Sequence, residues 1–427
     1  MKADLDDLLR SNAMDALLVI GPARHNPAMV YLTGLLHVSD GLLVKPRGRA
    51  PVLYCFPMER EEAARSGLET RVLNWHEFNQ TVKGDTVELM ARLCQHVLGE
   101  QRVTGRVAVY GQMEMGEALG ALRTVEERMP QVRFVSESRH ISVLGRARVT
   151  KDAGEVERIR RMGKVTVEVV GAVVDFLTSQ SVAGGHLVAK SGKPITVGEV
   201  KRLIHRLLSE RGAEDPEGTI FSVGRDAGIP HSAGLDGDLL PIGKPVLLDL
   251  FPCEAGGGYF YDFTRTWCLG HAADDVAAVH ELVLKAHQQS LASLRPGIQA
   301  MSVQERVCDL FEAQGHPTVR SQPDTQNGYV HSLGHGLGLE VHEPPAFRAS
   351  VEGQVALEPG MVFAIEPGLY YPEREIGLRL EDTVWLRPDG KPEVLAPYPM
   401  DLVLPVRSRR KTSTIRKGKS PRRRAKL

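Results

Sequence analysis

The chain has 427 residues, of which 42% are hydrophobic and 25% charged, a composition typical of a soluble globular protein and a length that exceeds one ordinary hydrophobic core. No apolar run reaches the ~18–20 residues of a membrane-spanning helix, and the acidic start at residues 1–7 lacks the layout of a signal peptide. The five cysteines show neither paired spacing nor a zinc-type cluster. We therefore expect free thiols and a reducing, cytoplasmic setting.

A formal net charge of zero conceals an uneven distribution of charge. Residues 407–427 contain 11 of the 53 lysines and arginines and no acidic residue, so the rest of the chain carries 42 bases against 53 acids. We expect this segment to be a solvated, disordered tail. A contact with nucleic acid or another acidic partner is the alternative interpretation.

Residues 1–145 alternate strand-like and helix-like patterns, and we expect them to form a separate α/β domain. Apolar runs predict strands at 15–20, 41–45, 51–55, 106–110 and 132–135, and longer periodic segments predict helices at 86–98 and 115–129. This part of the sequence contains no phosphate-binding loop and no cluster of catalytic residue types. We therefore expect the catalytic residues to lie further along the chain.

Three later helices are predicted by motifs in which a capping residue is followed by Glu three positions on. The expected helices run from Asp152 to about Leu177, from Thr196 to about Arg211 and from Ser302 onward, the last after a helix from about Asp274 to Leu294. A long helix, a capped helix and an acidic hairpin thus occur in the same order twice, about 100 residues apart. An internal duplication explains this order, and a chance recurrence of common helix caps is the alternative.

The first acidic hairpin is predicted at residues 246–267, where two apolar runs flank a Gly-rich turn. The midpoint of Asp249 and Asp262 falls in this turn, so a symmetric register would place the two carboxylates opposite each other. Like charges in that position destabilise a sheet. A bound cation would remove the conflict.

The second acidic hairpin, at residues 361–385, has the same arrangement with Glu366 and Glu381. Between the hairpins lie His331, His335 and His342, in a Gly-rich context that favours a loop and a strand over a helix. We interpret His335 as a ligand and His331 as a nearby residue. Four carboxylates and an imidazole suit two hard or borderline divalent cations.

At these positions the sequence resembles the metallopeptidases of the pita-bread fold, in the branch of the Xaa-Pro aminopeptidases and prolidases. The resemblance covers about 149–406 and rests on Asp249, Asp262-Phe-Thr-Arg-Thr, His335-Gly, Ile-Glu366-Pro-Gly and Leu-Arg-Leu-Glu381-Asp. One departure is that the spacing from Asp249 to Asp262 is two residues longer than the family pattern, with Leu-Phe-Pro in place of a Gly-containing stretch. An insertion of even length leaves the two Asp side chains on the same face of the hairpin, but it changes the neighbouring pocket wall.

The resemblance implies a creatinase-like α/β N-terminal domain (1–145), an α+β pita-bread catalytic domain (146–406) with internal pseudo-two-fold duplication, and a homodimer. It also implies two divalent cations, Mn²⁺ first, with Co²⁺, Zn²⁺ or Fe²⁺ as alternatives. The implied ligands are Asp249, Asp262, His335, Glu366 and Glu381.

Four further residues belong to the expected site. The resemblance places His231 near the bound peptide, His342 near the scissile bond and His331 in the same pocket. Arg379 lies two residues before Glu381, so both side chains should point to one face of the strand. It would either neutralise the ligating carboxylates or hold a substrate carboxylate in a bidentate contact.

Our hypothesis is a peptidase with two metal ions that hydrolyses the Xaa-Pro bond of dipeptides or of peptide N-termini by means of a metal-bridging hydroxide. Asp262 and Glu381 would bridge the ions, Glu366 would shuttle a proton, and His342 would help to stabilise the oxyanion. The alternative is a catalytically silent pita-bread relative that binds protein or nucleic acid. A metal-free hydrolase of the creatine type is a further alternative, against which the intact ligand positions argue.

Overall fold

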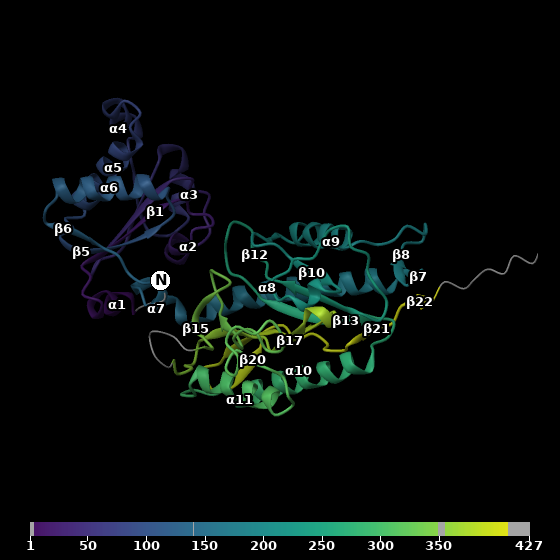
Figure 1. Ribbon diagram of the computed structural model, residues 1–427. Coiled ribbons are helices and arrows are strands. Elements are labelled where there is room, and N and C mark those ends of the chain that lie inside the picture. Colours follow the sequence, from purple (N-terminus) through teal and green to yellow (C-terminus); the bar gives the residue numbers. More distant parts are fainter. Residues whose placement is uncertain (1–3, 140, 349–354, 409–427) are drawn as a thin grey trace, which may run out of the picture.

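The computed structural model of the protein describes residues 4–139, 141–348 and 355–408 (Figure 1). Its first unit is built on a mixed six-stranded sheet in the order β4-β3-β2-β1-β5-β6, in which β1 pairs antiparallel with β2 and parallel with β5. The strands are β1 (Ala16–Gly21), β2 (Gly41–Pro46), β3 (Val52–Cys55), β4 (Glu69–Val72), β5 (Gly105–Gly111) and β6 (Val132–Val135).

Helices cover both faces of this sheet, because its central strand is apolar on both sides. Leu18 and Ile20 of β1 pack against α5 and α6, whereas Leu17 and Val19 pack against α1, α2 and α7. The helices are α1 (Leu5–Ser11), α2 (Pro27–Thr33), α3 (Arg60–Ala64), α4 (Trp75–Val82), α5 (Thr86–Glu100), α6 (Met115–Arg128) and α7 (Val143–Val149).

The second unit places its sheets between two helical layers, with α8 and α9 above the strands and α10 and α11 below them in Figure 1. The first half contains α8 (Ala153–Thr178), β7 (Ser181–Ala183), β8 (His186–Val188), α9 (Val197–Ser209), β9 (Ala213–Glu214), β10 (Ile220–Val223), β11 (Pro245–Leu250), β12 (Cys253–Glu254) and β13 (Phe263–Leu269). One apolar core lies between α8, α9 and the strands of this half.

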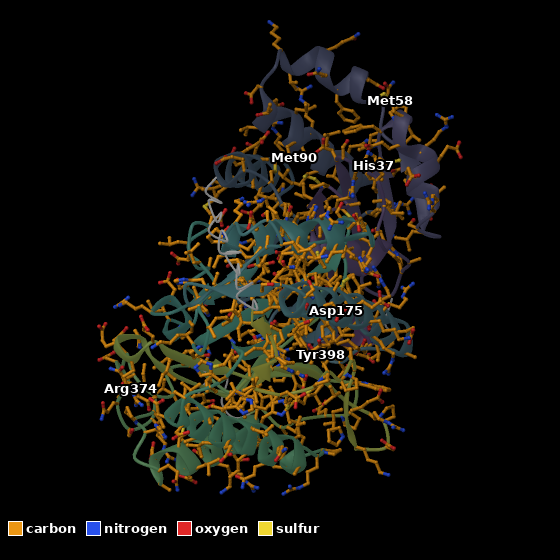
Figure 2. The ribbon with its side chains drawn as sticks, turned by 90° about the vertical axis from the view of Figure 1, so that its right-hand side faces the viewer. His37, Met58, Met90, Asp175, Arg374 and Tyr398 are labelled. Carbon is orange, nitrogen blue, oxygen red and sulfur yellow. The ribbon has the colours of Figure 1, made fainter. Side chains whose placement is uncertain are left out.

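The second half repeats the order of a long helix, a shorter helix and a hairpin, as the sequence predicted. It contains α10 (Asp274–Ser293), α11 (Ala300–Glu312), β14 (His335–Gly336), β15 (Glu343–Ala346), β16 (Val362–Ile365), β17 (Gly368–Tyr371), β18 (Ile376–Arg379), β19 (Asp382–Leu386) and β20 (Pro392–Val394), with β21 (Val403–Leu404) returning to β13. A second apolar core fills the space between α10, α11 and these strands. In the side view of Figure 2, His37 and Met58 lie in the N-terminal unit, at the opposite end of the molecule from Arg374 in the turn of the second hairpin.

Two of the three predicted helix caps are confirmed. The side chains of Asp152 and Thr196 each accept a hydrogen bond from the backbone of the Glu three residues later, which completes a capping box at α8 and at α9. The third prediction is wrong, because α11 begins at Ala300 and Ser302 lies inside it. The first helical amide of α11 donates to Val355 O at 2.9 Å, so a tertiary contact replaces a side-chain cap there.

The C-terminal end of the described chain is also longer than predicted. Arg407 and Ser408, which the sequence assigned to the tail, form β22 (Arg407–Ser408) and pair in parallel with Ser181 and Val182 of β7. The rest of the predicted tail, residues 409–427, lies outside the described residues. In the described part of the chain, no helix has both the length and the apolar character that crossing a membrane requires.

Candidate active site

The first hairpin does not have the predicted register. Asp249 of β11 lies opposite Thr264, and Leu250 lies opposite Phe263, so Asp262 comes just before the paired part of β13. The intervening loop is not symmetric, since β12 leaves the hairpin to pair with β9. Both carboxylates are nevertheless buried, with Asp249 7% and Asp262 3% exposed.

The second hairpin has the predicted register. Ile365 pairs with Asp382 before the break at Pro367, and Gly368 pairs with Arg379 after it. The same register on both sides of the break places Glu366 opposite Glu381. Proline interrupts the ladder here because it has no N–H to donate.

The two halves meet at an isolated antiparallel bridge between Thr264 and Glu381. The amide of Glu381 donates to Thr264 O at 3.0 Å, and the Thr264 hydroxyl donates to Glu381 Oε2 at 2.6 Å. This bridge brings the acidic residues of both hairpins into one buried cluster.

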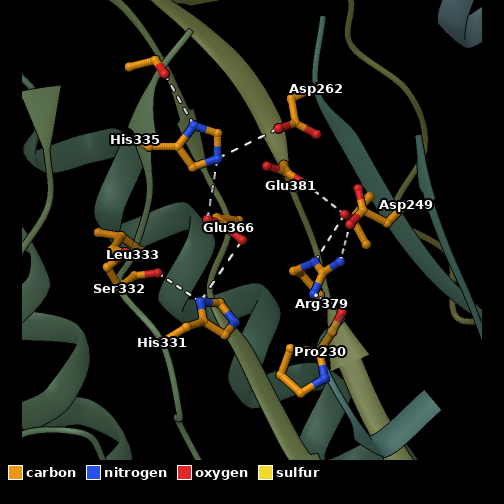
Figure 3. Close-up of polar contacts among 12 residues, drawn as sticks. Pro230, Asp249, Asp262, His331, Ser332, Leu333, His335, Glu366, Arg379 and Glu381 are labelled. Atoms are coloured by element: carbon orange, nitrogen blue, oxygen red, sulfur yellow. Dashed lines mark hydrogen bonds and ion pairs between the residues drawn. The ribbon is translucent and has the colours of Figure 1, made fainter. Parts of the chain in front are cut away.

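His335 completes the cluster from β14, which pairs with β16 of the second hairpin. Its Nε2 lies 3.6 Å from Asp262 Oδ2 and 3.6 Å from Glu366 Oε1 (Figure 3). Ligand atoms of Asp262, His335 and Glu381 all lie within 4.8 Å of one another. These three residues therefore form a group with the spacing of a metal site.

Burial and mutual repulsion disturb the acidic groups of this cluster. Burial, followed by the charges of Asp249 and Glu366, raises the pKa of Asp262 well above its usual value. Burial and the charge of Asp262 do the same to the pKa of Glu381. For Glu366, burial and Asp249 outweigh the opposing effect of Arg379 and raise the pKa to about 8. Without a cation, the carboxylates of the cluster bind protons more tightly than isolated carboxylates do.

The residues present fit a divalent metal site. Among the described residues, Oδ1 of Asp249 and Oδ1 of Asp262 are buried and have no hydrogen-bond partner, which is costly for carboxylate oxygens unless a cation binds them. Burial, with a smaller effect of His342, lowers the pKa of His335 to about 3. Its imidazole is therefore neutral, which is the form that binds metals.

Arg379 lies inside the cluster and is 2% exposed. Its guanidinium forms an ion pair with Asp249 (Figure 3). It donates from Nε to Thr264 Oγ1 at 3.0 Å, and from Nη1 to the Tyr370 hydroxyl at 2.9 Å and to Pro230 O at 3.3 Å. The predicted proximity of Arg379 to the acidic residues is thus observed.

The predicted pocket histidines lie around the same cluster. Nδ1 of His331 is 3.9 Å from Glu366 Oε2, and its Nε2 is 2.9 Å from the Tyr370 hydroxyl. The ring of His342 packs against that of His335 with 4.3 Å between centroids, and its side chain faces solvent. His231 is exposed and directly follows Pro230, whose carbonyl accepts from Arg379.

Two residues of this environment were not singled out from the sequence. The Thr264 hydroxyl lies between Arg379 Nε and Glu381 Oε2, and the Tyr370 hydroxyl contacts both Arg379 and His331. Thr264 is two residues after Asp262 in a predicted strand, so it shares its face, and that alternation was the available signal. Tyr370 gave no comparable signal.

The profile of the family described as metallopeptidase family M24 matches residues 157–388, more than half of the chain. The chain belongs to this family. Membership in M24 makes the protein a peptidase of a family that uses divalent metal ions, in agreement with the donor set described above.

Relatives of this M24 peptidase span nearly the whole chain. The probable dipeptidase PepE of Mycobacterium tuberculosis is 28% identical over 355 residues, which are 82% of this chain and 81% of the relative. The Xaa-Pro dipeptidase of Pyrococcus horikoshii is 28% identical over 386 residues, which are 90% and 93% of the two chains. The crystal structure of an X-Pro aminopeptidase from Thermotoga maritima, at 22% identity, gives a TM-score of 0.72 and covers 93% of this chain and 99% of that one. The predicted combination of an α/β unit with a duplicated pita-bread unit is confirmed.

Proposed function

We propose that this M24 peptidase hydrolyses the Xaa-Pro bond of dipeptides or of peptide N-termini. The observation that carries the proposal is the convergence of four carboxylates from the two hairpins and the imidazole of His335 from β14 in one cluster. Relatives named as Xaa-Pro dipeptidases support the substrate class. The proposed ligands of two divalent cations, Mn²⁺ first and Co²⁺, Zn²⁺ or Fe²⁺ as alternatives, are Asp249, Asp262, His335, Glu366 and Glu381.

When bound, the cations would supply Lewis acidity and lower the pKa of a coordinated water toward ~7. Glu366 is the proposed proton carrier, because its carboxylate lies beside both His335 and His331, at a position from which a carboxylate can take up a proton and give it back. The nitrogen of an Xaa-Pro bond has no hydrogen. It must be protonated to leave, and Glu366 is proposed to supply that proton.

The surrounding residues would orient the substrate and balance charge. Arg379 is proposed to neutralise Asp249, since its guanidinium pairs with that carboxylate and donates its other hydrogen bonds to Thr264, Tyr370 and the Pro230 carbonyl. Burial and then Arg379 lower the pKa of His331 to about 3, so His331 acts as a neutral hydrogen-bonding group. Exposed His342 and His231 are proposed to contact the developing oxyanion and the peptide, respectively.

Three further proposals concern the setting of the enzyme. All five cysteines are buried and free, which supports a reducing, cytoplasmic compartment. A homodimer is proposed from the resemblance to the family. The catalytically silent alternative gains no support, because all five proposed ligand positions lie around one cluster.

The deciding experiment compares Xaa-Pro dipeptides with Xaa-Pro-Xaa tripeptides in the presence of Mn²⁺, with a chelated sample and matched Xaa-Ala peptides as controls. Metal-dependent cleavage of one or both Xaa-Pro peptides is expected. Equal cleavage of the Xaa-Ala peptides would refute the proline preference, and cleavage that survives complete metal removal would refute the metal site.

A further inference from the structure

Arg265 of β13 is 1% exposed and has a partner for each of its five N–H groups. Nε donates to Pro399 O at 3.0 Å, and Nη1 donates to Thr264 O at 2.9 Å and to Glu381 O at 2.7 Å. Nη2 donates to Asp382 Oδ1 at 2.8 Å and to Tyr398 O at 2.9 Å. A guanidinium has five N–H donors, so this residue uses its full hydrogen-bonding capacity.

Two of these bonds converge where the two halves of the catalytic unit meet. Thr264 and Glu381 form an isolated bridge, and the Glu381 amide donates to Thr264 O. Arg265 Nη1 contacts the carbonyl oxygens of both residues. It gives Glu381 O the partner that a continuing ladder would have provided.

A buried anion holds the guanidinium in this position. Asp382 is 2% exposed and pairs with Arg265, while its Oδ2 lies 3.3 Å from Nε2 of His287 on α10. The Phe263 ring lies against the guanidinium with 4.4 Å from Cζ to the ring centroid. Ionic, hydrogen-bonding and cation–π contacts therefore fix Arg265 from several sides.

We propose that Arg265 is a positioning residue that holds the Glu381 carboxylate in the metal cluster by fixing the backbone of Thr264 and Glu381. Its hydrogen bonds to these two residues go to carbonyl oxygens and not to the Glu381 carboxylate, so it acts through the chain that carries the ligand. Thr264 extends the effect, since its hydroxyl donates directly to Glu381 Oε2. The proposal rests on the proposed function, because it concerns the affinity of that metal site.

The test is the affinity of the metal-free full-length protein for Mn²⁺, measured by titration calorimetry on Arg265→Lys. Lysine keeps the charge but cannot reach five acceptors from a single nitrogen, so we expect the Kd to rise 10- to 100-fold. Arg148→Lys is the matched control, because Arg148 is also a largely buried arginine paired with acids, Glu340 and Glu343, outside the proposed ligand set. Its Kd should stay within twofold of the wild type.

The same variants separate positioning from general destabilisation. In Arg265→Lys, the dependence of kcat on Mn²⁺ should shift to higher concentrations with an unchanged KM for the peptide, and Arg148→Lys should not show this shift. An Arg265→Lys protein that folds and binds Mn²⁺ as tightly as the wild type would overturn the proposal.

A second variant keeps the proposal testable if Arg265→Lys does not fold. Asp382→Asn preserves the shape of the side chain that pairs with Arg265 and removes its charge. We expect a smaller loss of Mn²⁺ affinity than in Arg265→Lys, and an unchanged Kd would contradict the positioning role. If the wild type itself binds no Mn²⁺ and cleaves no Xaa-Pro peptide, the proposed function fails. If the wild type does both, unaffected variants reject only the role of Arg265.

Discussion

Nε2 of His335 and Oδ2 of Asp262 lie 3.6 Å apart, although the two residues come from different halves of the duplicated unit. The distance is too long for a hydrogen bond, and the lowered pKa of His335, about 3, leaves its imidazole neutral. Their separation suits two ligands of one cation better than an ion pair.

The first prediction is that metal binding releases protons and reverses a loss of stability at high pH. Partly buried Glu366 has a pKa of about 8, above its usual 4.5, so the folded metal-free protein holds a proton that the unfolded chain has lost. The metal-free protein should therefore lose stability as the pH rises from about 4.5 to about 8. Saturating Mn²⁺ should remove this loss, as measured by urea midpoints across that pH range.

Calorimetry of Mn²⁺ binding in buffers of different ionisation enthalpy gives an independent measurement. We expect protons to be released at pH 7, because cations displace them from the cluster. If the heat of binding is the same in every buffer, no proton is released and this account of the acidic cluster is wrong.

The second prediction concerns Glu366 and has a control within the chain. Glu366→Gln keeps the size of the side chain but removes its ability to carry a proton, so we expect kcat to fall by about 10²–10⁴-fold with the fold retained. Glu358 also stands in a Glu-Pro-Gly sequence, but it is exposed in a turn before β16. Glu358→Gln should keep nearly full activity, and wild-type turnover in Glu366→Gln would remove the proton-carrying role.

The third prediction distinguishes the roles of the two exposed histidines of the candidate site, His342 and His231. His342→Ala should lower kcat by about 10²–10³-fold, because its ring packs on His335 beside the reacting centre. His231→Ala should mainly raise KM, because the loop that carries it borders the cluster through Pro230. Steady-state kinetics with one Xaa-Pro dipeptide distinguishes them, with His96→Ala in α5 as the distant control. Identical kinetic effects in both variants would contradict the assignment.

The sequence predicted most of this site because its residues stand at fixed positions in two hairpins. Glu366 and Glu381 lie symmetrically about a short turn, and a two-stranded ladder leaves little freedom in the register. The same reasoning was wrong for Asp249 and Asp262, since the loop between them contains a strand that pairs elsewhere. Symmetry about a midpoint predicts pairing only where the connection is a simple turn.

Other features depended on contacts between distant parts of the chain. The first amide of α11 donates to the carbonyl of Val355, more than 50 residues later in the chain. The strand β22 forms by pairing with β7, which is more than 200 residues before it. The roles of Thr264 and Arg265 follow from their contacts with Glu381, more than 100 residues away. No local pattern in the sequence contains such partners.

The fourth prediction concerns Glu343, which connects the junction of the two units, at Arg148 and Lys151, to the loop that carries His342. Its carboxylate is buried, contacts Arg148 and Lys151, and accepts hydrogen bonds from the amides of Leu339 and Glu340. Burial alone would raise its pKa, but the two positive charges outweigh this effect and lower the pKa to about 2.

Because the pKa of Glu343 is lower in the folded than in the unfolded state, its contribution to stability is complete above pH ~4.5 and is lost as the pH falls toward 2. Glu343→Gln leaves Lys151 buried without a counter-charge, so we expect it to cost on the order of 3–5 kcal/mol at pH 7. Urea denaturation from pH 2 to pH 8 should show this difference shrinking below pH ~4.5. The control Glu340→Gln, at a partly exposed position, should cost less, and a pH-independent difference for Glu343→Gln would show that the ion pairs do not cause the loss.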